Sequence, residues 1–373
     1  MTFIADVEAT IPYLIGAFVA AAAIAFLLTP IVRGRAIVMR MVDRPNQRRV
    51  NTRPIPRAGG IAVATAFLVV AVAVVVLAPE LSFIERRPRL DGGQLAALLL
   101  GGAVAALIGL ADDYFDLRAR WQLLGQIVLA LGAVGLGIGI AFVNNPFAEG
   151  VLRFEGVIAV AITVLWIVGM INSVNFIDGL DGLSSGIALI AAVTLGVISL
   201  SIDIRQPYVA LLCLTLAGAL LGFLRWNFHP AAIFIGTSGT MFIGYTLAVL
   251  SILGSAKVAV ALLVLGVPII DTFWIIVRRL LARRSPFTPD RGHIHHRLLD
   301  LGLSHRQTVM LIYAICVALA ILSLVLSGAN QVYAFVGVFV GTGMLLLLLA
   351  WRGFTHEALE AESYDPDTPR AAG

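Results

Sequence analysis

Long apolar runs alternate with short polar stretches along most of the chain. The runs are continuously apolar instead of alternating between apolar and polar residues, so they predict helices and not the strands of a membrane barrel. Most of them approach the ~20 residues that cross the hydrocarbon core of a bilayer. We expect eleven helices, near residues 11–32, 60–79, 94–111, 121–142, 154–171, 183–200, 206–223, 239–254, 258–277, 308–327 and 331–350.

The composition agrees with a membrane protein. Of the 373 residues, 60% are hydrophobic and 13% are charged, whereas a soluble chain would carry about 25% charged residues. We therefore predict an all-α, polytopic integral membrane protein with a single transmembrane domain over residues 1–350. The polar segment 351–373 is expected to be a disordered tail. Cys213 and Cys316 lie inside apolar runs, which argues against a disulfide framework.

Eleven helices divide the loops into two sets on opposite sides of the membrane. Most of the 26 Lys and Arg residues fall in one set, and such residues concentrate in cytoplasmic loops. We therefore place this set in the cytoplasm, the N-terminus outside and the C-terminal tail inside. The net charge of +4 then reflects membrane orientation, and we expect no nucleic-acid partner. The cytoplasmic set comprises 33–59, 112–120, 172–182, 224–238, 278–307 and the tail.

Nearly every polar cluster of the sequence falls in this cytoplasmic set. If such clusters only separated the helices, both sides of the membrane should carry them. We therefore predict one site at the cytoplasmic interface. The clusters read "DRPNQRRVNTRPIPRAGG", "ADDYFD", "NSVNFIDGLDG", "RWNFHP" and "DRGHIHHRL".

Three aspartates, Asp112, Asp113 and Asp116, lie within five residues. A solvated loop would account for a single acid. Adjacent carboxylates repel each other, however, and a divalent cation removes that repulsion. Mg²⁺ takes hard oxygen ligands and bridges them to substrate phosphates. The pair therefore predicts a metal and phosphate site.

Polar groups recur at every third position in Asn172, Asn175, Asp178 and Asp181. On a continuous helix, steps of three residues would turn the last group to the opposite face. The glycines at 179 and 182 predict instead that the helix ends near Asp178 and that the backbone folds back. The four side chains would then converge on a pocket for a metal or the edge of a base. A glycine-rich turn with helix caps is the alternative.

Three histidines, His293, His295 and His296, lie in the most basic part of the chain. Imidazole is a good zinc ligand, but this spacing is too tight for an ordinary structural zinc site and no cysteine is near. Histidines and arginines such as Arg291 beside a metal site favour phosphate or diphosphate contacts. An exposed basic loop is the alternative.

Arg57 lies in the stretch "PIPRAGG" of the first cytoplasmic loop. The prolines stiffen this stretch, and Gly59 and Gly60 allow the backbone to approach a ligand closely. Arg57 would then bind a phosphate through two parallel hydrogen bonds. The other arginines of the loop are expected to contact anionic lipid head groups.

Taken together, these clusters resemble the polyprenyl-phosphate N-acetylhexosamine-1-phosphate transferases. That superfamily also holds the phospho-N-acetylmuramoyl-pentapeptide transferases. The resemblance runs from about Asp43 to Leu303, and the histidine motif looks like the branch that transfers N-acetylglucosamine-1-phosphate. The matching motifs are, in order, "DRP…PIPRAGG", "GLADDYFDL", "NSVNFIDGLDGL", "FHPAAIFIG", "PIIDT" and "PDRGHIHHRL".

The resemblance implies a reaction. A polyprenyl phosphate, such as undecaprenyl phosphate, attacks the β-phosphate of a UDP-N-acetylamino sugar and yields a polyprenyl-diphospho-sugar and UMP. The cofactor would be Mg²⁺, with Mn²⁺ as an alternative. Residues 1–350 would form one catalytic domain in a bacterial plasma membrane, with a cytoplasmic active site that starts a cell-envelope glycan pathway. By the same resemblance, a homodimer is an option.

The resemblance also implies roles for single residues. Catalytic roles fall to Asp112, Asp113 and Asp178, and metal contacts to Asp112, Asp113 and Asn172. A phosphate monoester is already largely ionised at pH 7, so positioning and charge neutralisation should matter more than a base. A covalent aspartyl-phosphate route is the alternative. The residues expected to bind substrate are Arg57, Asn175, Asp181, Arg291, His293, His295 and His296.

The sequence departs from the family pattern at two positions. Thr237 stands in "GTSG" where the family usually has an aspartate that binds the metal, and a hydroxyl is a poorer Mg²⁺ ligand than a carboxylate. Asn51 stands where the family often has histidine. We expect weaker metal binding, a larger share for Asp112, Asp113 and Asn172, or altered activity.

Three other functions compete with this interpretation. An intramembrane aromatic prenyltransferase would space its Asn and Asp residues by four positions and carry two such motifs. A transporter would place its carboxylates near the membrane midplane, whereas these acids lie at predicted helix ends. A catalytically weak family member with a binding or regulatory role has only Thr237 in its favour.

Overall fold

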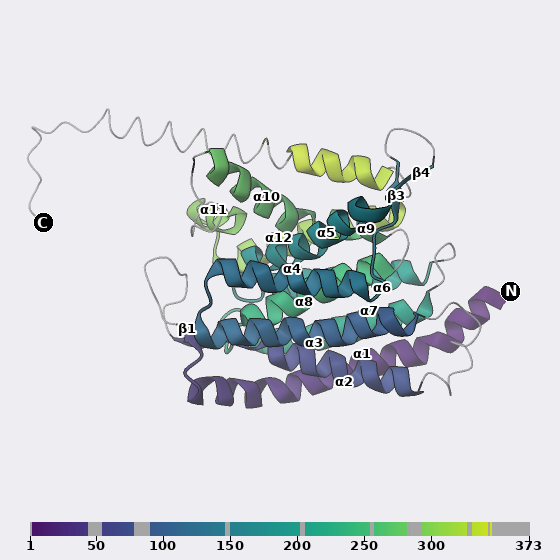
Figure 1. The fold of residues 1–373 in the computed structure, drawn as a ribbon. Helices are drawn as coiled ribbons and strands as arrows, with labels where there is room; N and C mark the ends of the chain where they lie inside the picture. The colour runs from purple at the N-terminus through teal and green to yellow at the C-terminus, as the bar shows by residue number, and fades with distance from the viewer. Residues whose placement is uncertain are drawn as a thin grey trace, which may run out of the picture.

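The computed structural model describes residues 2–43, 54–77, 90–145, 150–201, 206–253, 257–281, 283, 293–326, 330–341 and 344. The described chain is a bundle of helices (Figure 1). The helices are α1 (Thr2–Val38), α2 (Gly60–Leu77), α3 (Gly92–Phe115), α4 (Ala119–Gly135), α5 (Gly156–Ile177), α6 (Leu183–Ser199), α7 (Pro207–Asn227), α8 (Gly236–Leu253), α9 (Lys257–Val264), α10 (Gly266–Leu281), α11 (Ile294–Asp300) and α12 (His305–Val325).

Two short antiparallel strand pairs accompany the helices. The pair β1 (Val42–Asp43) and β2 (Ile55–Pro56) lies before α2, with Val42 opposite Pro56. The pair β3 (Phe142–Asn144) and β4 (Val151–Arg153) connects α4 to α5. Both pairs are too short to change the fold class, so the prediction of an all-α protein is confirmed.

Seven described helices are long and apolar enough to cross a membrane: α1, α2, α3, α5, α7, α8 and α12. Helices α9 and α10 meet at 77° and would make an eighth span if they form one bent segment. These helices support a multi-pass membrane protein. Each predicted apolar run contains a helix, but α4, α6 and the helix Asn330–Gly341 are shorter than the ~20 residues of a typical span. The number eleven and the orientation of the termini therefore stay predictions, and the tail 351–373 lies outside the described residues.

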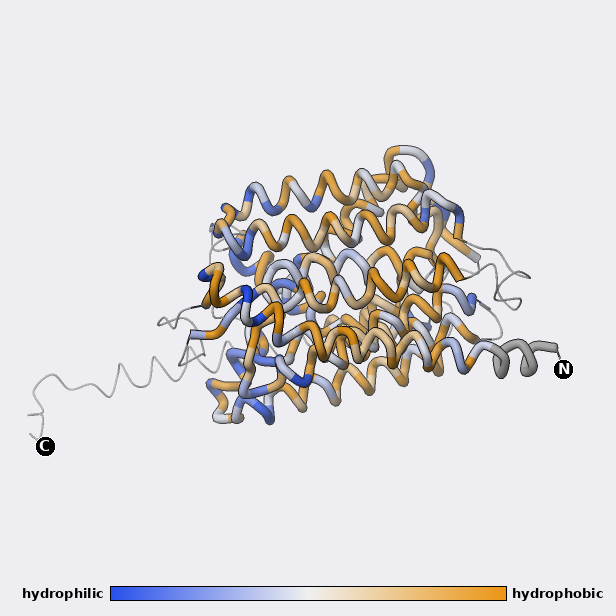
Figure 2. Tube along the Cα trace, turned by 90° about the horizontal axis from the view of Figure 1, so that it is seen from below, coloured by the Kyte–Doolittle hydropathy of each residue, from blue (hydrophilic) through white to orange (hydrophobic). Residues whose placement is uncertain are grey.

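The core of the bundle is built around α7 and α8, which are the most buried of the spans. Helix α1 packs along α7, and α3 packs along α8. Outer helices expose large apolar side chains such as Leu27 and Leu165, as expected of surfaces that face lipid tails. Figure 2 shows apolar residues along the flanks, whereas hydrophilic residues gather most densely at the end of the bundle away from the N-terminus. That end holds the first turns of α4 and α8 and the last turns of α3 and α5.

Two glycines let α1 and α7 approach closely. Gly218 and Gly222 are four residues apart and therefore lie on one face of α7. A Cβ atom at Gly218 would collide with the backbone of Phe18, and one at Gly222 with the backbone of Ala22. Small residues at this spacing are typical of close helix contacts in membranes. Burying apolar surface away from lipid tails stabilises a helix pair little, so the pair depends on close van der Waals packing.

We predict that Gly222→Ala lowers the midpoint of thermal denaturation of the purified protein in detergent. The added methyl group meets backbone atoms that cannot rotate away, and overpacking of this kind costs about 1–3 kcal/mol. Gly16→Ala on α1 is the matched control, because nothing lies within 4 Å of a Cβ there. Alanine is favoured over glycine in a helix by about 1 kcal/mol, so the control should be as stable as wild type or more so. Equal midpoints for the two variants would contradict the close contact.

Candidate active site

The end of α3 places Asp112 and Asp113 in the last helical turn, where both are buried. The helix begins at a capping box made by Asp91 and Gln94. It stops because Asp116 adopts a left-handed conformation, with φ of 49°, and its N–H bonds back to the carbonyl of Asp112. The two adjacent carboxylates therefore have fixed directions, and each finds a different partner.

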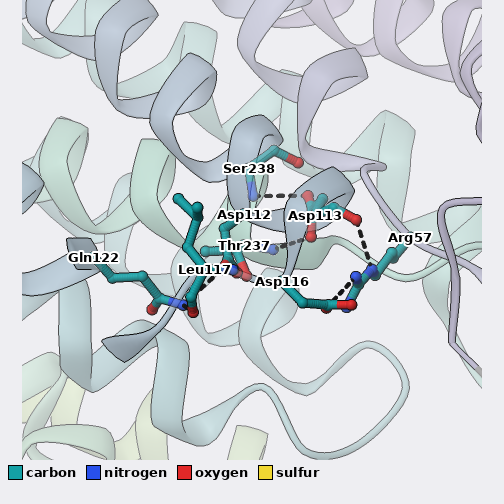
Figure 3. A network of polar contacts seen from close by, with 8 residues as sticks. All are labelled: Arg57, Asp112, Asp113, Asp116, Leu117, Gln122, Thr237 and Ser238. Atoms are coloured by element: carbon teal, nitrogen blue, oxygen red, sulfur yellow. Dashed lines mark hydrogen bonds and ion pairs between the residues drawn. The ribbon is translucent and has the colours of Figure 1, made fainter. Parts of the chain in front are cut away.

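Asp113 connects α3 to the beginning of α8. One carboxylate oxygen accepts a hydrogen bond from the backbone N–H of Thr237 at 2.9 Å, and the other accepts one from Ser238 at 3.0 Å (Figure 3). The first N–H groups of a helix have no partner within the helix and carry partial positive charge. A buried carboxylate is well suited to satisfy them. Asp113 thus acts as the N-terminal cap of α8.

Asp112 turns instead toward α4. Its Oδ1 atom accepts hydrogen bonds from the backbone N–H of Leu117 at 2.9 Å and from the side-chain amide of Gln122 at 2.7 Å (Figure 3). Both donors engage the same oxygen of the carboxylate. The second oxygen, Oδ2, is left with capacity to bind a ligand.

Asn172 on α5 is held by α4 as well. Its amide nitrogen donates to the Gln126 side-chain oxygen at 2.6 Å and to the backbone carbonyl of Val168 at 2.8 Å. An amide has two N–H groups, so both are used and the amide oxygen is left as an acceptor. Gln122 and Gln126 are one turn apart on α4, and side chains at this spacing are neighbours. They therefore bring Asp112 and Asn172 toward the same part of the bundle.

A further contact closes a ring of polar groups through four helices. The Thr240 hydroxyl on α8 donates to the Asn175 side-chain oxygen on α5 at 3.0 Å. Because Asp113 caps the same helix α8, the contacts run from α3 to α4, α5, α8 and back to α3. We call this set the polar ring: Asp112, Gln122, Gln126, Asn172, Asn175, Thr240 and Asp113.

Arg57 lies beside the ring. The segment after β2 pairs with the segment before α8, through hydrogen bonds from Phe234 N–H to the Pro56 carbonyl at 2.8 Å and from Gly59 N–H to the Phe234 carbonyl at 2.9 Å. The guanidinium donates from Nε to the backbone carbonyl of Asp113 at 3.0 Å and from Nη2 to the Asp116 carboxylate at 2.5 Å. Arg57 therefore joins the segment before α2 to the end of α3, and its contact with a phosphate stays a prediction.

The turn between α5 and α6 contains Asp178 and Asp181. Helix α5 ends at Ile177, so the predicted helix end is confirmed. Gly182, with φ of 80°, is the residue just before α6, which begins at Leu183. The Ser184 hydroxyl donates to Asp178 at 2.5 Å. The pKa of Asp178 is raised to about 7, chiefly by burial; the hydrogen bond from Ser184 lowers it, and the negative charges of Asp113 and Asp181 raise it.

Asp181 makes its contacts with the segment between α7 and α8. Its Oδ2 atom accepts from Ala231 N–H at 3.0 Å and lies 2.7 Å from Nδ1 of His229. The four side chains of the motif, from Asn172 to Asp181, thus share no partner with one another. The turn brings them to one end of the bundle, but it does not direct them into one shared contact.

The histidine motif is anchored to α10 by Asp271. Its carboxylate lies 2.6 Å from Nδ1 of His293 and accepts the N–H of Ile294 at 2.8 Å. His295 stacks on His293, with ring centroids 5.4 Å apart, and a side chain at Gly179 would collide with its ring. The motif therefore lies against the turn between α5 and α6.

Burial of His295 determines its charge state. Burial holds the pKa of His295 well below its usual value, and repulsion from His296, His293 and His305 lowers it further. His295 is therefore neutral at pH 7 and would contact an anion by donating a hydrogen bond, not as a cation. Arg291, also expected to bind substrate, lies outside the described residues, as does Asn51.

Several residues of this region were missed by the reasoning from sequence. Gln122 and Gln126 lie four positions apart inside a predicted apolar run, and that spacing of two amides on one helical face was a usable signal. Asp271 stands in the motif "PIIDT", but nothing in the sequence indicated that it contacts His293.

A helical bundle that gathers carboxylates, amides and histidines at one end of its spans defines a multi-pass membrane protein with a polar site at that end. Residues 95–255 match the family described as glycosyl transferase family 4. This match covers most of α3 and the whole of α4 to α8, which carry the polar ring.

Similar proteins are found along most of the chain. A Bacillus subtilis protein named "Probable undecaprenyl-phosphate N-acetylglucosaminyl 1-phosphate transferase" is 35% identical over 84% of this chain and 85% of its own length. The decaprenyl-phosphate N-acetylglucosaminephosphotransferase of Mycolicibacterium smegmatis is 35% identical over 79% of this chain and 77% of its own. The undecaprenyl-phosphate alpha-N-acetylglucosaminyl 1-phosphate transferase of Thermotoga maritima is 29% identical over 87% and 94%.

The chain therefore belongs to glycosyl transferase family 4, and its resemblance to the polyprenyl-phosphate N-acetylhexosamine-1-phosphate transferases is confirmed. It is an enzyme of the sugar phosphotransferase kind.

We predict that Asp113→Ala lowers the midpoint of thermal denaturation in detergent, because it leaves two N–H groups at the start of α8 without their cap. Loss of a helix cap costs about 0.5–2 kcal/mol. Asp116→Asn is the matched control: its side chain is 79% exposed, asparagine tolerates the left-handed backbone at this position, and exposed ion pairs contribute only about 0–1 kcal/mol. Asp113→Asn should lie between the two, since an amide keeps one acceptor. An Asp113→Ala protein as stable as the control would refute the capping role.

Proposed function

We propose that the protein transfers N-acetylglucosamine-1-phosphate from UDP-N-acetylglucosamine to a polyprenyl phosphate. Its relatives are named for undecaprenyl phosphate or decaprenyl phosphate and for N-acetylglucosamine. These names support a polyprenyl phosphate as the acceptor and N-acetylglucosamine as the transferred sugar. The products would be polyprenyl-diphospho-N-acetylglucosamine and UMP. In the reaction, an oxygen of the lipid phosphate bonds to the β-phosphorus of the nucleotide sugar. The bond from that phosphorus to the bridging oxygen breaks, and UMP leaves with this oxygen.

One observation carries the proposal: the polar ring fixes two oxygen acceptors at the same end of the bundle. Gln122 engages one oxygen of Asp112, and Gln126 with Val168 uses both N–H groups of Asn172. The second carboxylate oxygen and the amide oxygen are therefore oriented before any ligand arrives. Preorganised groups of this kind contribute more to catalysis than groups that must first reorient.

The two oxygens suit a magnesium ion. Carboxylate and amide oxygens are hard ligands, which Mg²⁺ prefers, and it commonly binds through one or two carboxylates together with substrate phosphates. When bound, Mg²⁺ or Mn²⁺ would neutralise phosphate charge that builds up as two anions meet. Asp112 and Asn172 are the residues that would hold it.

Asp113 takes a different part in this proposal from the one expected on the sequence. Both of its oxygens accept N–H groups of α8, so its first task is to fix the start of that helix. Thr237, which by the resemblance stands in place of an aspartate of the family pattern, lies at this same start. With a hydroxyl there instead of a carboxylate, Asp112 and Asn172 would be the main oxygen ligands, with Asp113 contributing its negative charge.

Most of the remaining candidates would bind the substrates. Asp178 and Asp181 lie in the turn between α5 and α6, where Asp178 would contact the nucleotide and Asp181, held by His229 and Ala231, would fix the turn. His293, His295 and His296 lie against that turn and would donate hydrogen bonds to the diphosphate or the sugar. In this proposal the polar end faces the cytoplasm of a bacterium, and the reaction is the first membrane step of a cell-envelope glycan pathway.

The proposal is tested by measuring UMP release from UDP-N-acetylglucosamine and polyprenyl phosphate by the purified protein in detergent with Mg²⁺. Asp112→Asn should lower the rate about 100-fold or more, as expected for the loss of a group that stabilises charge during the reaction. Glu155→Gln, an exposed carboxylate at the opposite end of α5, is the control and should keep the wild-type rate.

Two outcomes would contradict different parts of the proposal. If wild-type protein releases no UMP from UDP-N-acetylglucosamine but does so from another UDP-sugar, the donor is wrong and the reaction class is right. If Asp112→Asn is as active as Glu155→Gln, the reaction does not depend on the polar ring.

A further inference from the structure

Three segments far apart in the sequence meet at Asp181, His229 and His305. Asp181 lies in the turn between α5 and α6, His229 in the segment between α7 and α8, and His305 is the first residue of α12. One ligand atom from each of the three lies within 4.8 Å of the others. None of them belongs to the polar ring or to the histidine motif. Two imidazoles and a carboxylate at this separation form a set of metal-binding donors.

The two histidines lie face to face. Their ring centroids are 4.1 Å apart and their planes differ by 21°. Two protonated imidazoles would repel each other in this arrangement, so the packing favours neutral rings. Neutral imidazole is the form that binds metals. His229 also presents Nδ1 at 2.7 Å from Oδ2 of Asp181, so the nitrogen and the carboxylate already face each other.

His305 has a buried ring nitrogen with no hydrogen-bond partner among the described residues. This atom, Nε2, is shielded from solvent. A proton on Nδ1 would leave a lone pair on Nε2 that can bind a cation. The second ring nitrogen of a metal-binding histidine commonly donates to a carbonyl or carboxylate.

We propose that Asp181, His229 and His305 bind a divalent transition-metal cation of the zinc type. Two nitrogen donors and one oxygen suit Zn²⁺, which often takes three protein ligands and a water molecule. They do not suit Mg²⁺, which prefers oxygen ligands throughout. The site is therefore distinct in its chemistry from the Mg²⁺ site proposed for catalysis.

The position of the site indicates what the cation does. Two other contacts from α12 reach the same segments: Arg306 donates to the carbonyl of His229 at 3.1 Å, and the Tyr313 hydroxyl donates to the carbonyl of Gly182. Helix α12 lies beyond the residues that match the family. The cation would join α12 to the turn that carries Asp178 and Asp181. It would thereby hold in place the turn that is proposed to bind the nucleotide.

The site can be tested without measuring catalysis. Full-length protein with a purification tag that lacks histidine is stripped with a chelator, incubated with Zn²⁺ in the presence of excess Mg²⁺, and desalted. Bound zinc per chain is then measured by plasma mass spectrometry, and affinity by titration. We expect one zinc per chain, a higher thermal midpoint with zinc, and at least a tenfold loss of affinity in His305→Ala and in His229→Gln.

Matched variants separate this site from the histidine motif. His296→Ala removes one imidazole from the motif and should keep zinc affinity, as should His356→Ala in the tail. Asp181→Asn should lower the affinity without removing a histidine, which serves if His305→Ala does not fold. Absence of zinc binding by wild type, or loss of binding in His296→Ala with retention in His305→Ala, would overturn the proposal. Neither result depends on the transferase reaction.

Discussion

The carboxylate of Asp113 is the contact on which the rest of the polar end depends. It joins the last turn of α3 to the first N–H groups of α8 at Thr237 and Ser238. Without this contact, the first N–H groups of α8, at Thr237 and Ser238, would lose their cap, which costs about 0.5–2 kcal/mol. With it, α8 begins at a fixed place, and Thr240 one turn later can reach Asn175 on α5.

Some polar atoms at this end of the bundle bond the helices to one another, and other oxygens of the same side chains keep the capacity to bind a ligand. Apolar flanks that face lipid offer polar groups no water, so amides and carboxylates must satisfy one another at the helix ends. Gln122 and Gln126 on α4 do this for Asp112 and Asn172 and still leave one oxygen on each. The same contacts that stabilise the helix ends thus orient the groups proposed to carry the chemistry.

The helices were predictable because apolar runs of this length have few alternatives. The number of spans was not, because α4 ends at Gly135, well before the end of its predicted run, and α9 meets α10 at 77°. Neither feature follows from hydropathy. In the site, the acidic and amide residues were recognisable from the sequence, because polar side chains are costly to place next to a membrane-spanning helix. Their partners did not, since Asn172 and Gln126 are 46 positions apart and Asp113 and Thr237 are 124 apart. A single sequence carries no signal for such pairs.

The central claim is that Asp112 and Asn172 hold the divalent cation against the phosphates of the nucleotide sugar. Pulsed electron paramagnetic resonance of Mn²⁺ added to the protein with UDP-N-acetylglucosamine measures this directly, through the coupling of phosphorus-31 nuclei to the bound ion. We predict coupling in the wild type and in Glu155→Gln, and its loss in Asn172→Ala and Asp112→Asn. Unchanged phosphorus coupling in both of the latter variants would contradict the account.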